Sequence, residues 1–257
     1  MKIWWRLLFI LLGIQSLLAQ DHFRGIEITW MGHAAFQLTS AEGVVIWIDP
    51  WLKNPKSPIS PEKVQKGDII LISHGHFDHI GDAVTIAQKT GAVIVSNFEI
   101  TRYLAAQGVL EKQLIGMNIS GTVQIKGITI TMVTAVHSSG ISRENEMIEG
   151  GHAAGFVVTF PDGFRIYHTG DTGLFGDMKL IRQLYSPDVM LVCIGDHFTM
   201  GPREAAVAVE MVKPRWVIPM HYGTFPLLKG SPEDFRKALS AQLRGRLIVT
   251  VPGKTLK

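Results

Sequence analysis

Short apolar runs alternate with glycine, proline and polar breaks along most of the chain. Runs of this kind predict strands, here at 26–30, 34–39, 44–48, 68–73, 92–95, 121–125, 128–134, 153–160, 164–168, 188–194, 215–219 and 246–251. Longer segments with helical spacing of apolar residues predict helices at about 80–89, 98–107, 177–185, 203–212 and 232–241. Because the early strands follow short turns and the later ones follow helices, we expect an α/β domain with two mixed sheets and helices outside them.

The first twenty residues have a different pattern. Lys2 and Arg6 precede an apolar stretch from Leu7 to Ala19, which is typical of a secretory signal. The stretch is shorter than the roughly 20 residues of a spanning helix, and no cysteine directly follows it. We therefore expect a signal peptide over 1–20, a hydrolase domain over 21–257, export to the periplasm or the medium, and no stable membrane insertion once the leader is removed. The cleavage motif is imperfect, so a retained leader that acts as an anchor stays an alternative.

Composition limits the partners. The 257 residues suffice for one large domain. The formal charge of +3 includes two basic residues of the leader, and the remaining basic residues are scattered. This charge distribution argues against nucleic-acid binding and favours a small-molecule substrate. A homo-oligomer is also possible. Cys193 is the single cysteine, which rules out an internal disulfide, and its apolar surroundings predict a packing role.

A cluster of potential metal ligands directly follows the apolar run 69–72: His74, His76, Asp78 and His79. Three imidazoles and a carboxylate are tolerated side by side in a folded protein only when they are paired or coordinated. In an extended segment His74 and His76 share a face. Asp78 and His79 lie beyond the turn and reach a neighbouring ion.

Three more candidates lie just beyond other apolar runs: His137, Asp171 and His221. Together with the cluster they supply the ligands of a two-metal hydrolytic centre, with room left for a water. Nitrogen and carboxylate ligands without thiolate favour zinc, with manganese and iron as alternatives.

The order His-x-His-x-Asp-His, then a separate His, an Asp and a final His, resembles the metallo-β-lactamase superfamily over nearly the whole chain after about residue 25. The similarity is greatest to uncharacterised metal-dependent hydrolases related to ascorbate-6-phosphate lactonase. It is carried by Trp30-Met-Gly-His33, Thr134-Ala-Val-His137-Ser-Ser, His168-Thr-Gly-Asp171-Thr and Gly195-Asp-His197-Phe-Thr-Met-Gly-Pro202. The resemblance implies a four-layer αββα sandwich with the metals at one edge between the sheets.

The resemblance also implies two divalent cations and a division of the ligands. The first metal takes His74, His76 and His137, the second takes Asp78, His79 and His221, and Asp171 bridges them. At the position of Asp171, zinc β-lactamases commonly have a Cys, a Ser or no bridging ligand. Di-iron oxygen and nitric oxide reductases carry Glu where His76 stands, which makes redox chemistry a weaker hypothesis.

The predicted reaction is hydrolysis of a small ester, lactone or phosphodiester by a hydroxide held between the metals. Asp78 would orient that hydroxide as well as bind metal. No protein nucleophile is required, and Ser138 and Ser139 do not belong to a Gly-x-Ser-x-Gly elbow. Two alternatives stay open: a periplasmic zinc β-lactamase and a non-catalytic metal-binding protein.

Other histidines near the motifs suggest supporting roles. His197 follows the strand over 188–194, so it either contacts substrate and donates a proton to the leaving group or makes a structural hydrogen bond. His33 could hold a metal ligand through its ring. His168 is expected to pack inside its strand.

Two further segments could border the site. Gly201-Pro202 begins a predicted helix, which indicates either ordinary capping or, with Arg203, an anion site at the helix N-terminus. The polar, glycine-ended segment 138–151 is long enough to form a flap beside the metals.

Overall fold

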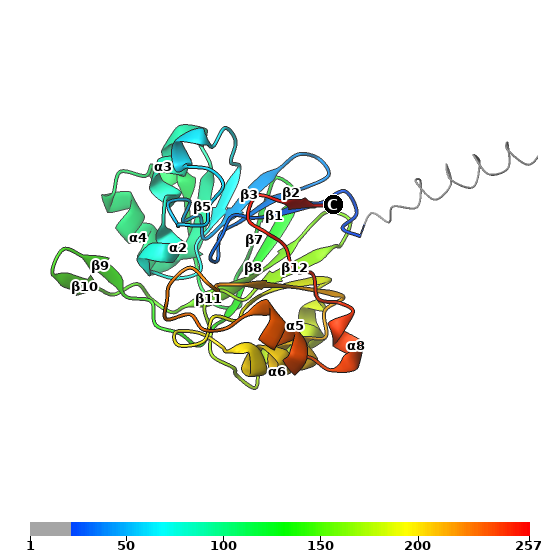
Figure 1. The fold of residues 1–257 in the computed structure, drawn as a ribbon. Coiled ribbons are helices and arrows are strands. Elements are labelled where there is room, and N and C mark those ends of the chain that lie inside the picture. The colour runs from blue at the N-terminus through cyan, green and yellow to red at the C-terminus, as the bar shows by residue number, and fades with distance from the viewer. Residues whose placement is uncertain (1–21) are drawn as a thin grey trace, which may run out of the picture.

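Two β-sheets face each other at the centre of the molecule, with helices on the outside (Figure 1). The structure, a computed structural model, describes residues 22–257, and the predicted leader over 1–20 lies outside them. The first sheet has the order β15 (Thr255–Leu256), β1 (Glu27–Trp30), β2 (Phe36–Thr39), β3 (Val45–Ile48), β4 (Ile69–Leu71), β5 (Val93–Asn97) and β6 (Leu114–Met117). The second has the order β14 (Trp216–Met220), β13 (Val189–Cys193), β12 (Arg165–His168), β11 (Ala154–Thr159), β8 (Ile128–Thr134) and β7 (Thr122–Ile125).

Helices flank each sheet, and a separate hairpin projects beside them (Figure 1). The hairpin consists of β9 (Ile141–Arg143) and β10 (Glu146–Ile148). The helices on the side of the first sheet are α2 (Phe77–Ile80), α3 (Ala83–Thr90) and α4 (Phe98–Ala106), with short 3-10 turns at Pro61–Lys63 and Glu111–Gln113. Those on the side of the second sheet are α5 (Met178–Tyr185), α6 (Pro202–Val212), α7 (Pro232–Ala238) and α8 (Ala241–Arg244).

The layered arrangement follows from side chains that alternate between the two faces of each strand, as β3 shows. Ile46 and Ile48 belong to the large apolar core that the two sheets share. Val45 and Trp47 belong to a second core beneath α3 and α4. Successive side chains of a strand point to opposite faces, so four consecutive apolar residues predict a strand that is buried on both sides. The expected αββα fold is confirmed.

Strand direction gathers the candidate ligands at one edge. β3 to β6 run parallel in the first sheet, and β12 to β14 run parallel in the second. The carboxyl ends of parallel strands meet at the same edge of a sheet, where α/β folds place their ligand sites. The cluster after β4, Asp171 after β12 and His221 after β14 all occupy such positions.

Several predicted boundaries were wrong. The helix expected at 80–89 begins at Phe77 and is broken at Gly81, which has a φ of 48°. The strand expected at 246–251 does not form: Leu247 makes a single bridge to Val217, and beyond it Val249 and Val251 are exposed, so the segment leaves the core. β6, β9, β10 and β15 were not predicted, because the first is half-exposed and the others span three residues or fewer.

Within residues 22–257, no helix has the length and apolar character needed to cross a membrane.

Candidate metal centre

The four-ligand cluster divides at the start of α2. His76 is the N-cap of this helix and has extended backbone angles, with φ −68° and ψ 151°. The preceding ligand His74 therefore lies on the same extended segment. Asp78 and His79 stand in the first turn of α2, where the chain has changed direction. This local geometry produces the division that the spacing predicted.

Gly75 allows another segment to approach the cluster closely. A Cβ at this position would lie 2.3 Å from the carbonyl oxygen of Ser139. Ser139 Oγ accepts a hydrogen bond from Gly75 N at 3.0 Å and donates one to Gly150 O at 2.7 Å. These contacts hold the segment that carries His137, and the base of the hairpin behind it, against the cluster.

The first predicted ligand set comes together. His74, His76 and His137 each offer a ring nitrogen, and these nitrogens lie within 4.8 Å of one another. The ring centroids of His74 and His76 both lie 5.0 Å from that of His137. His76 Nε2 is also 3.3 Å from Ser138 Oγ.

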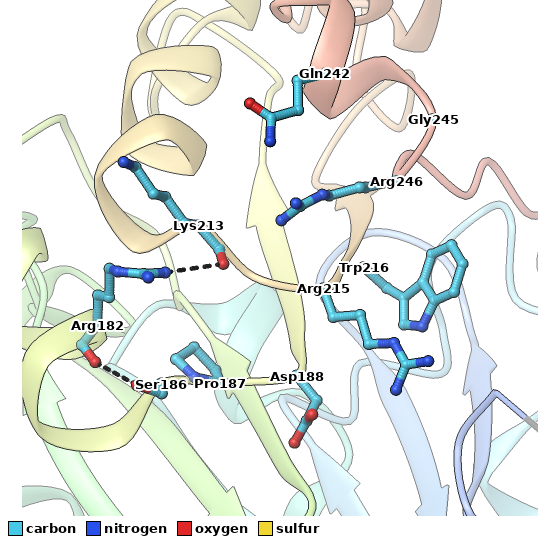
Figure 2. A pocket seen from close by; sticks show the side chains of 10 residues that line it. All are labelled: Arg182, Ser186, Pro187, Asp188, Lys213, Arg215, Trp216, Gln242, Gly245 and Arg246. Carbon is cyan, nitrogen blue, oxygen red and sulfur yellow. Dashed lines mark hydrogen bonds between the residues drawn. The ribbon is translucent and has the colours of Figure 1, made fainter.

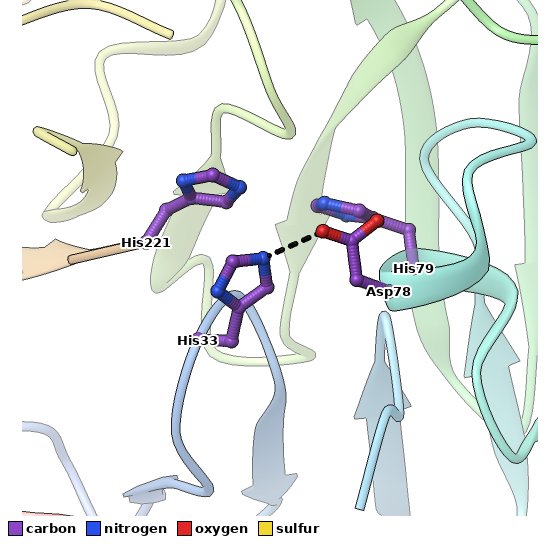
Figure 3. A group of neighbouring side chains, drawn as sticks. All are labelled: His33, Asp78, His79 and His221. Carbon is purple, nitrogen blue, oxygen red and sulfur yellow. Dashed lines mark hydrogen bonds and ion pairs between the residues drawn. The ribbon is translucent and has the colours of Figure 1, made fainter. Parts of the chain in front are cut away.

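The second set comes together with one additional member, His33 (Figure 3). The ligand atoms of His33, Asp78, His79 and His221 lie within 4.8 Å of one another. His33 Nε2 donates to Asp78 Oδ2 at 2.9 Å, and its Nδ1 accepts from Thr224 Oγ1 at 3.0 Å. Because both ring nitrogens are engaged, the structure supports a role for His33 in holding Asp78.

Asp171 lies between the two sets. Its Oδ2 is 2.9 Å from His221 Nε2, 3.2 Å from His79 Nε2 and 3.8 Å from His137 Nε2. It also forms a ligand group with His74 and His79. One carboxylate therefore touches residues of both predicted metal sites.

The turn after β12 places this carboxylate. Gly170 has a φ of 60°, and a Cβ there would lie 2.3 Å from Ala154 O. Only glycine adopts this conformation at that spacing without strain. The next side chain, Asp171, is thereby directed inward and is 3% exposed.

The donor atoms fit divalent metal ions. Among residues 22–257, buried atoms without a hydrogen-bond partner include His79 Nε2, Asp171 Oδ1 and both ring nitrogens of His221. Leaving such groups unpaired costs about 1–3 kcal/mol each. His221 Nε2 and Asp171 Oδ2 are close but not aligned for a hydrogen bond. Imidazole nitrogens and carboxylates that converge without thiolate match the ligands of zinc and related cations.

The charges around Asp171 depend on one another. Burial alone would raise the pKa of Asp171, but the facing imidazoles of His221 and His79 hold it well below its usual range. Burial alone would lower the pKa of His79, but Asp171 and Asp49 hold it well above its usual range. His79 thus stands between two carboxylates that both favour positive charge there.

Two other imidazoles of the centre, those of His74 and His33, are kept neutral. Burial, together with His79, holds the pKa of His74 well below its usual range. Burial and the neighbouring His221 lower the pKa of His33 to about 4. Burial would raise the pKa of Asp78, but the hydrogen bond from His33 outweighs it and the pKa is about 2. Neutral imidazoles beside an ionised carboxylate are in the protonation states that metal binding requires.

Asp49 is a functional candidate that the sequence reasoning missed. It is fully buried after β3, and its Oδ2 accepts from His79 Nδ1 at 2.8 Å. Its Oδ1 and Oδ2 also accept from Ser73 N and Ser73 Oγ, at 2.7 and 2.6 Å. This leaves His79 Nε2 facing the site, the arrangement in which a carboxylate orients a metal-binding histidine. The available signal was a lone acidic residue between a buried strand and Pro50.

Three residues of the centre have left-handed backbone conformations. The φ angles are 54° at His33, 46° at Asp49 and 57° at His221. Each costs a residue with a side chain about 1–2 kcal/mol, and strain of this kind concentrates at functional sites.

The remaining sequence candidates lie elsewhere. His197 is exposed and packs on Phe198. Phe198 lines the metal cavity, which also contains His76, Asp78, His137, Asp171 and His221, whereas His197 does not. Its role as proton donor stays a prediction. His168 is buried in β12 and contacts Ala34 O at 3.0 Å, consistent with packing inside the strand.

The helix start and the cysteine have structural contacts. Gly201 N donates to Glu204 Oε2 at 3.3 Å, which caps α6. Cys193 is fully buried in β13, and burial raises its pKa to about 11. Such a thiol is unreactive.

A second hollow, of about 730 Å³, lies where β13 and β14 begin, at the ends of these strands opposite to His221 (Figure 2). Its lining includes the cations Arg182, Lys213, Arg215 and Arg246. Arg182 donates to Lys213 O at 3.3 Å and Arg246 donates to Pro214 O at 2.9 Å. Cations at the carboxyl end of a helix such as α6 satisfy its last carbonyl groups, so these arginines have a structural role.

Comparison with known proteins shows the family. A model described as the beta-lactamase superfamily domain matches residues 27–221. The chain belongs to the metallo-β-lactamase superfamily. A protein of Methanosarcina mazei named a metal-dependent hydrolase is 46% identical over 233 residues, which are 90% of this chain and 98% of that protein. One from an Anaeromyxobacter species with the same name is 49% identical over 236 residues, 89% of this chain and 85% of that protein.

A solved structure agrees with this superfamily assignment. A novel metallo hydrolase from the archaeon Ignicoccus hospitalis has a TM-score of 0.79 and 37% identity, covering 90% of this chain and 97% of that chain. The expectation of a metal-dependent hydrolase of the metallo-β-lactamase fold is confirmed at that level.

Proposed function

We propose that the protein is a dinuclear hydrolase that cleaves a small ester, lactone or phosphodiester, with zinc as the metal. The observation that carries this proposal is the position of Asp171, whose carboxylate contacts ligands of both groups. Two divalent cations held there would activate a water at neutral pH and stabilise negative charge on a substrate oxygen.

The chain's own groups prepare the cavity for this chemistry. Asp78 stays ionised at neutral pH and lines the cavity, so it can accept a hydrogen bond from a water there. Its orientation is set by His33, whose second ring nitrogen is fixed by Thr224. The hydroxyl groups of Ser138 and Ser142 also line the cavity and can donate to a substrate oxygen.

Substitution of Asp171 tests the dinuclear proposal. The Asp171→Asn variant keeps the shape of the side chain but removes its charge, so we expect the bound metal to fall from two ions per chain towards one. We expect activity to fall by more than the roughly 100-fold loss typical of removing an outer partner of a metal ligand. Elemental analysis and turnover of a lactone, a phosphodiester and a chromogenic cephalosporin measure both effects.

The exposed residue Asp177 supplies the matched control, because Asp177→Asn removes the same charge outside the centre. Wild-type protein that holds a single metal ion, or an Asp171→Asn variant with full metal content and activity, would contradict the dinuclear scheme. Turnover of the cephalosporin alone would favour the β-lactamase alternative.

We further propose that the protein acts after export, on the basis of the leader pattern over 1–20. Mass spectrometry of the protein from its own cells should find the periplasmic or secreted form without this leader. Cytoplasmic protein that retains Met1 would contradict the proposal.

A further inference from the structure

The metal cavity has an apolar wall. The cavity has a volume of about 640 Å³, which is typical of small-molecule sites. Besides candidate ligands and the two serines, its lining consists of Phe77, Met147, Phe198, Phe225, Pro226 and Leu227. These side chains come from α2, from the hairpin and from the loops after β13 and β14.

The apolar wall is exposed rather than buried in the core. The exposed fractions are 62% for Phe77, 69% for Met147, 50% for Phe198 and 51% for Leu227. Large apolar side chains from separate segments that surround one opening mark a binding surface for an apolar ligand. Met147 adds adaptability, because an unbranched side chain on a projecting hairpin can follow the shape of a bound group.

The same cavity offers no cationic side chain. Neither Lys nor Arg occurs among its lining residues, which include the carboxylates of Asp78 and Asp171. The cations of the second hollow, drawn in Figure 2, stand where β13 and β14 begin, whereas the metal cavity lies beyond the carboxyl ends of these strands. A charged group on the part of the substrate that lies against the wall would therefore lose its hydration without gaining a partner.

We infer that the substrate is an uncharged carboxylic ester or lactone whose acyl or alkyl chain packs against Phe77, Met147 and Leu227. This inference rests on the proposed hydrolase function and narrows it to carboxylic esters and lactones. The reaction consumes one water: its oxygen bonds to the carbonyl carbon, and the bond from that carbon to the alcohol oxygen breaks. One proton of the water goes to the departing alcohol, and the other is released by the carboxylic acid that forms.

A series of p-nitrophenyl esters tests the apolar wall in metal-loaded protein. From acetate to hexanoate we expect kcat/KM to rise about fourfold for each added methylene until the cavity is filled. The hemisuccinate ester, whose acyl chain ends in a carboxylate, should react at least about tenfold more slowly than the butyrate ester, and bis-p-nitrophenyl phosphate should not be preferred to either. A flat series, or a preference for the charged ester or the phosphodiester, overturns the inference.

Three variants locate the effect. Leu227→Ser should flatten the chain-length series, whereas Leu184→Ser, at a residue 64% exposed on α5 outside the cavity, should leave it unchanged. Met147→Arg places a cation at the wall and should raise the rate ratio of hemisuccinate to butyrate. An unchanged series in Leu227→Ser, or an unchanged ratio in Met147→Arg, counts against the apolar wall.

A binding experiment tests this inference independently of the proposed function. Heptan-2-one has a carbonyl group and an alkyl chain but no bond to hydrolyse. Calorimetry should detect its binding with a negative heat-capacity change, weakened in Leu227→Ser. If the ketone binds but no ester, lactone or phosphodiester is turned over, the proposed function fails and the apolar site stands. If the ketone does not bind, the inference fails even when some other substrate is cleaved.

Discussion

Asp49 shows how a residue outside the ligand set controls the centre. Its carboxylate accepts a hydrogen bond from His79 Nδ1, and this contact directs His79 Nε2 towards Asp171. Two hydrogen bonds from Ser73 hold the carboxylate in turn. The orientation of a ligand therefore depends on a network that begins at the end of β3.

Asp49→Asn should weaken metal binding without unfolding the protein. The amide keeps an acceptor but loses the negative charge that favours His79 as a ligand, so we expect a 10- to 100-fold loss of affinity. Competition with a chromophoric chelator measures it. Asp162→Asn, at a side chain 42% exposed, is the control. Equal affinities for the Asp49 variant and the wild type would show that the network is not needed.

Gly75 is a second single-residue requirement. Gly75→Ala would place a Cβ 2.3 Å from a backbone oxygen, so the segment of Ser139 must move. We expect a loss of about 1–3 kcal/mol in the free energy of unfolding, measured by urea denaturation.

Gly245 provides the control for this substitution. No atom lies within 4 Å of a Cβ there, and its φ is −69°. Gly245→Ala should be neutral or stabilise the protein by about 0.4–1 kcal/mol. Equal effects of the two substitutions would mean that the approach of Ser139 to Gly75 is not tight.

At the level of elements, one ion pair joins the two sheets. Asp68, at the start of β4, contacts Lys126 in the turn between β7 and β8, and its Oδ2 accepts from Val45 N at 2.9 Å. Partial burial would raise the pKa of Asp68, but the hydrogen bonds from Lys126 and Val45 outweigh it, and the pKa is lowered.

Asp68→Asn should therefore reduce stability in a pH-dependent way. A carboxyl group whose pKa is lowered by folding stabilises the protein above its unfolded pKa, and this contribution is lost as the pH falls through the folded value. Because Lys126 is mostly exposed, we expect only about 1 kcal/mol at pH 7. Urea denaturation at pH 7 and at pH 3 should show the difference from wild type shrinking in acid. A difference that grows in acid would contradict the assignment.

The elements differ in how far the sequence could predict them. Strands such as β3 and β13 were predictable because their apolar residues are buried on both faces. β15, only two residues long, forms because the chain end returns to β1, which no local pattern records.

The same difference between local patterns and distant pairs applies to the candidate metal centre. The cluster and the three later ligands stand where strand ends meet, so their convergence was predictable. The role of His33 in holding a ligand was predicted from the residues around it, although its partner Asp78 was not, because Asp78 is far away in sequence. Asp49 and His79 form a pair of the same kind. Such pairs have no signature within either segment.

For the whole molecule, metal binding adds to a fold that already has its own core. The shared apolar core and the core beneath α3 and α4 do not depend on the ligands, so the metal-free protein should still fold. An ion that binds only the folded state adds about 2.7 kcal/mol at a free concentration 100-fold above its Kd. Two ions should thus raise Tm by about 10–20 °C in a domain of this size.

Differential scanning calorimetry before and after chelation measures this shift. Zn²⁺ added back should restore the higher Tm, whereas Mg²⁺ should not, because it prefers oxygen ligands and the centre is mainly imidazole. In Asp171→Asn the shift should be roughly halved, because the ligand shared by both groups is lost. A Tm that is the same with and without Zn²⁺ would mean that the converging histidines stabilise the fold themselves and do not form a metal centre.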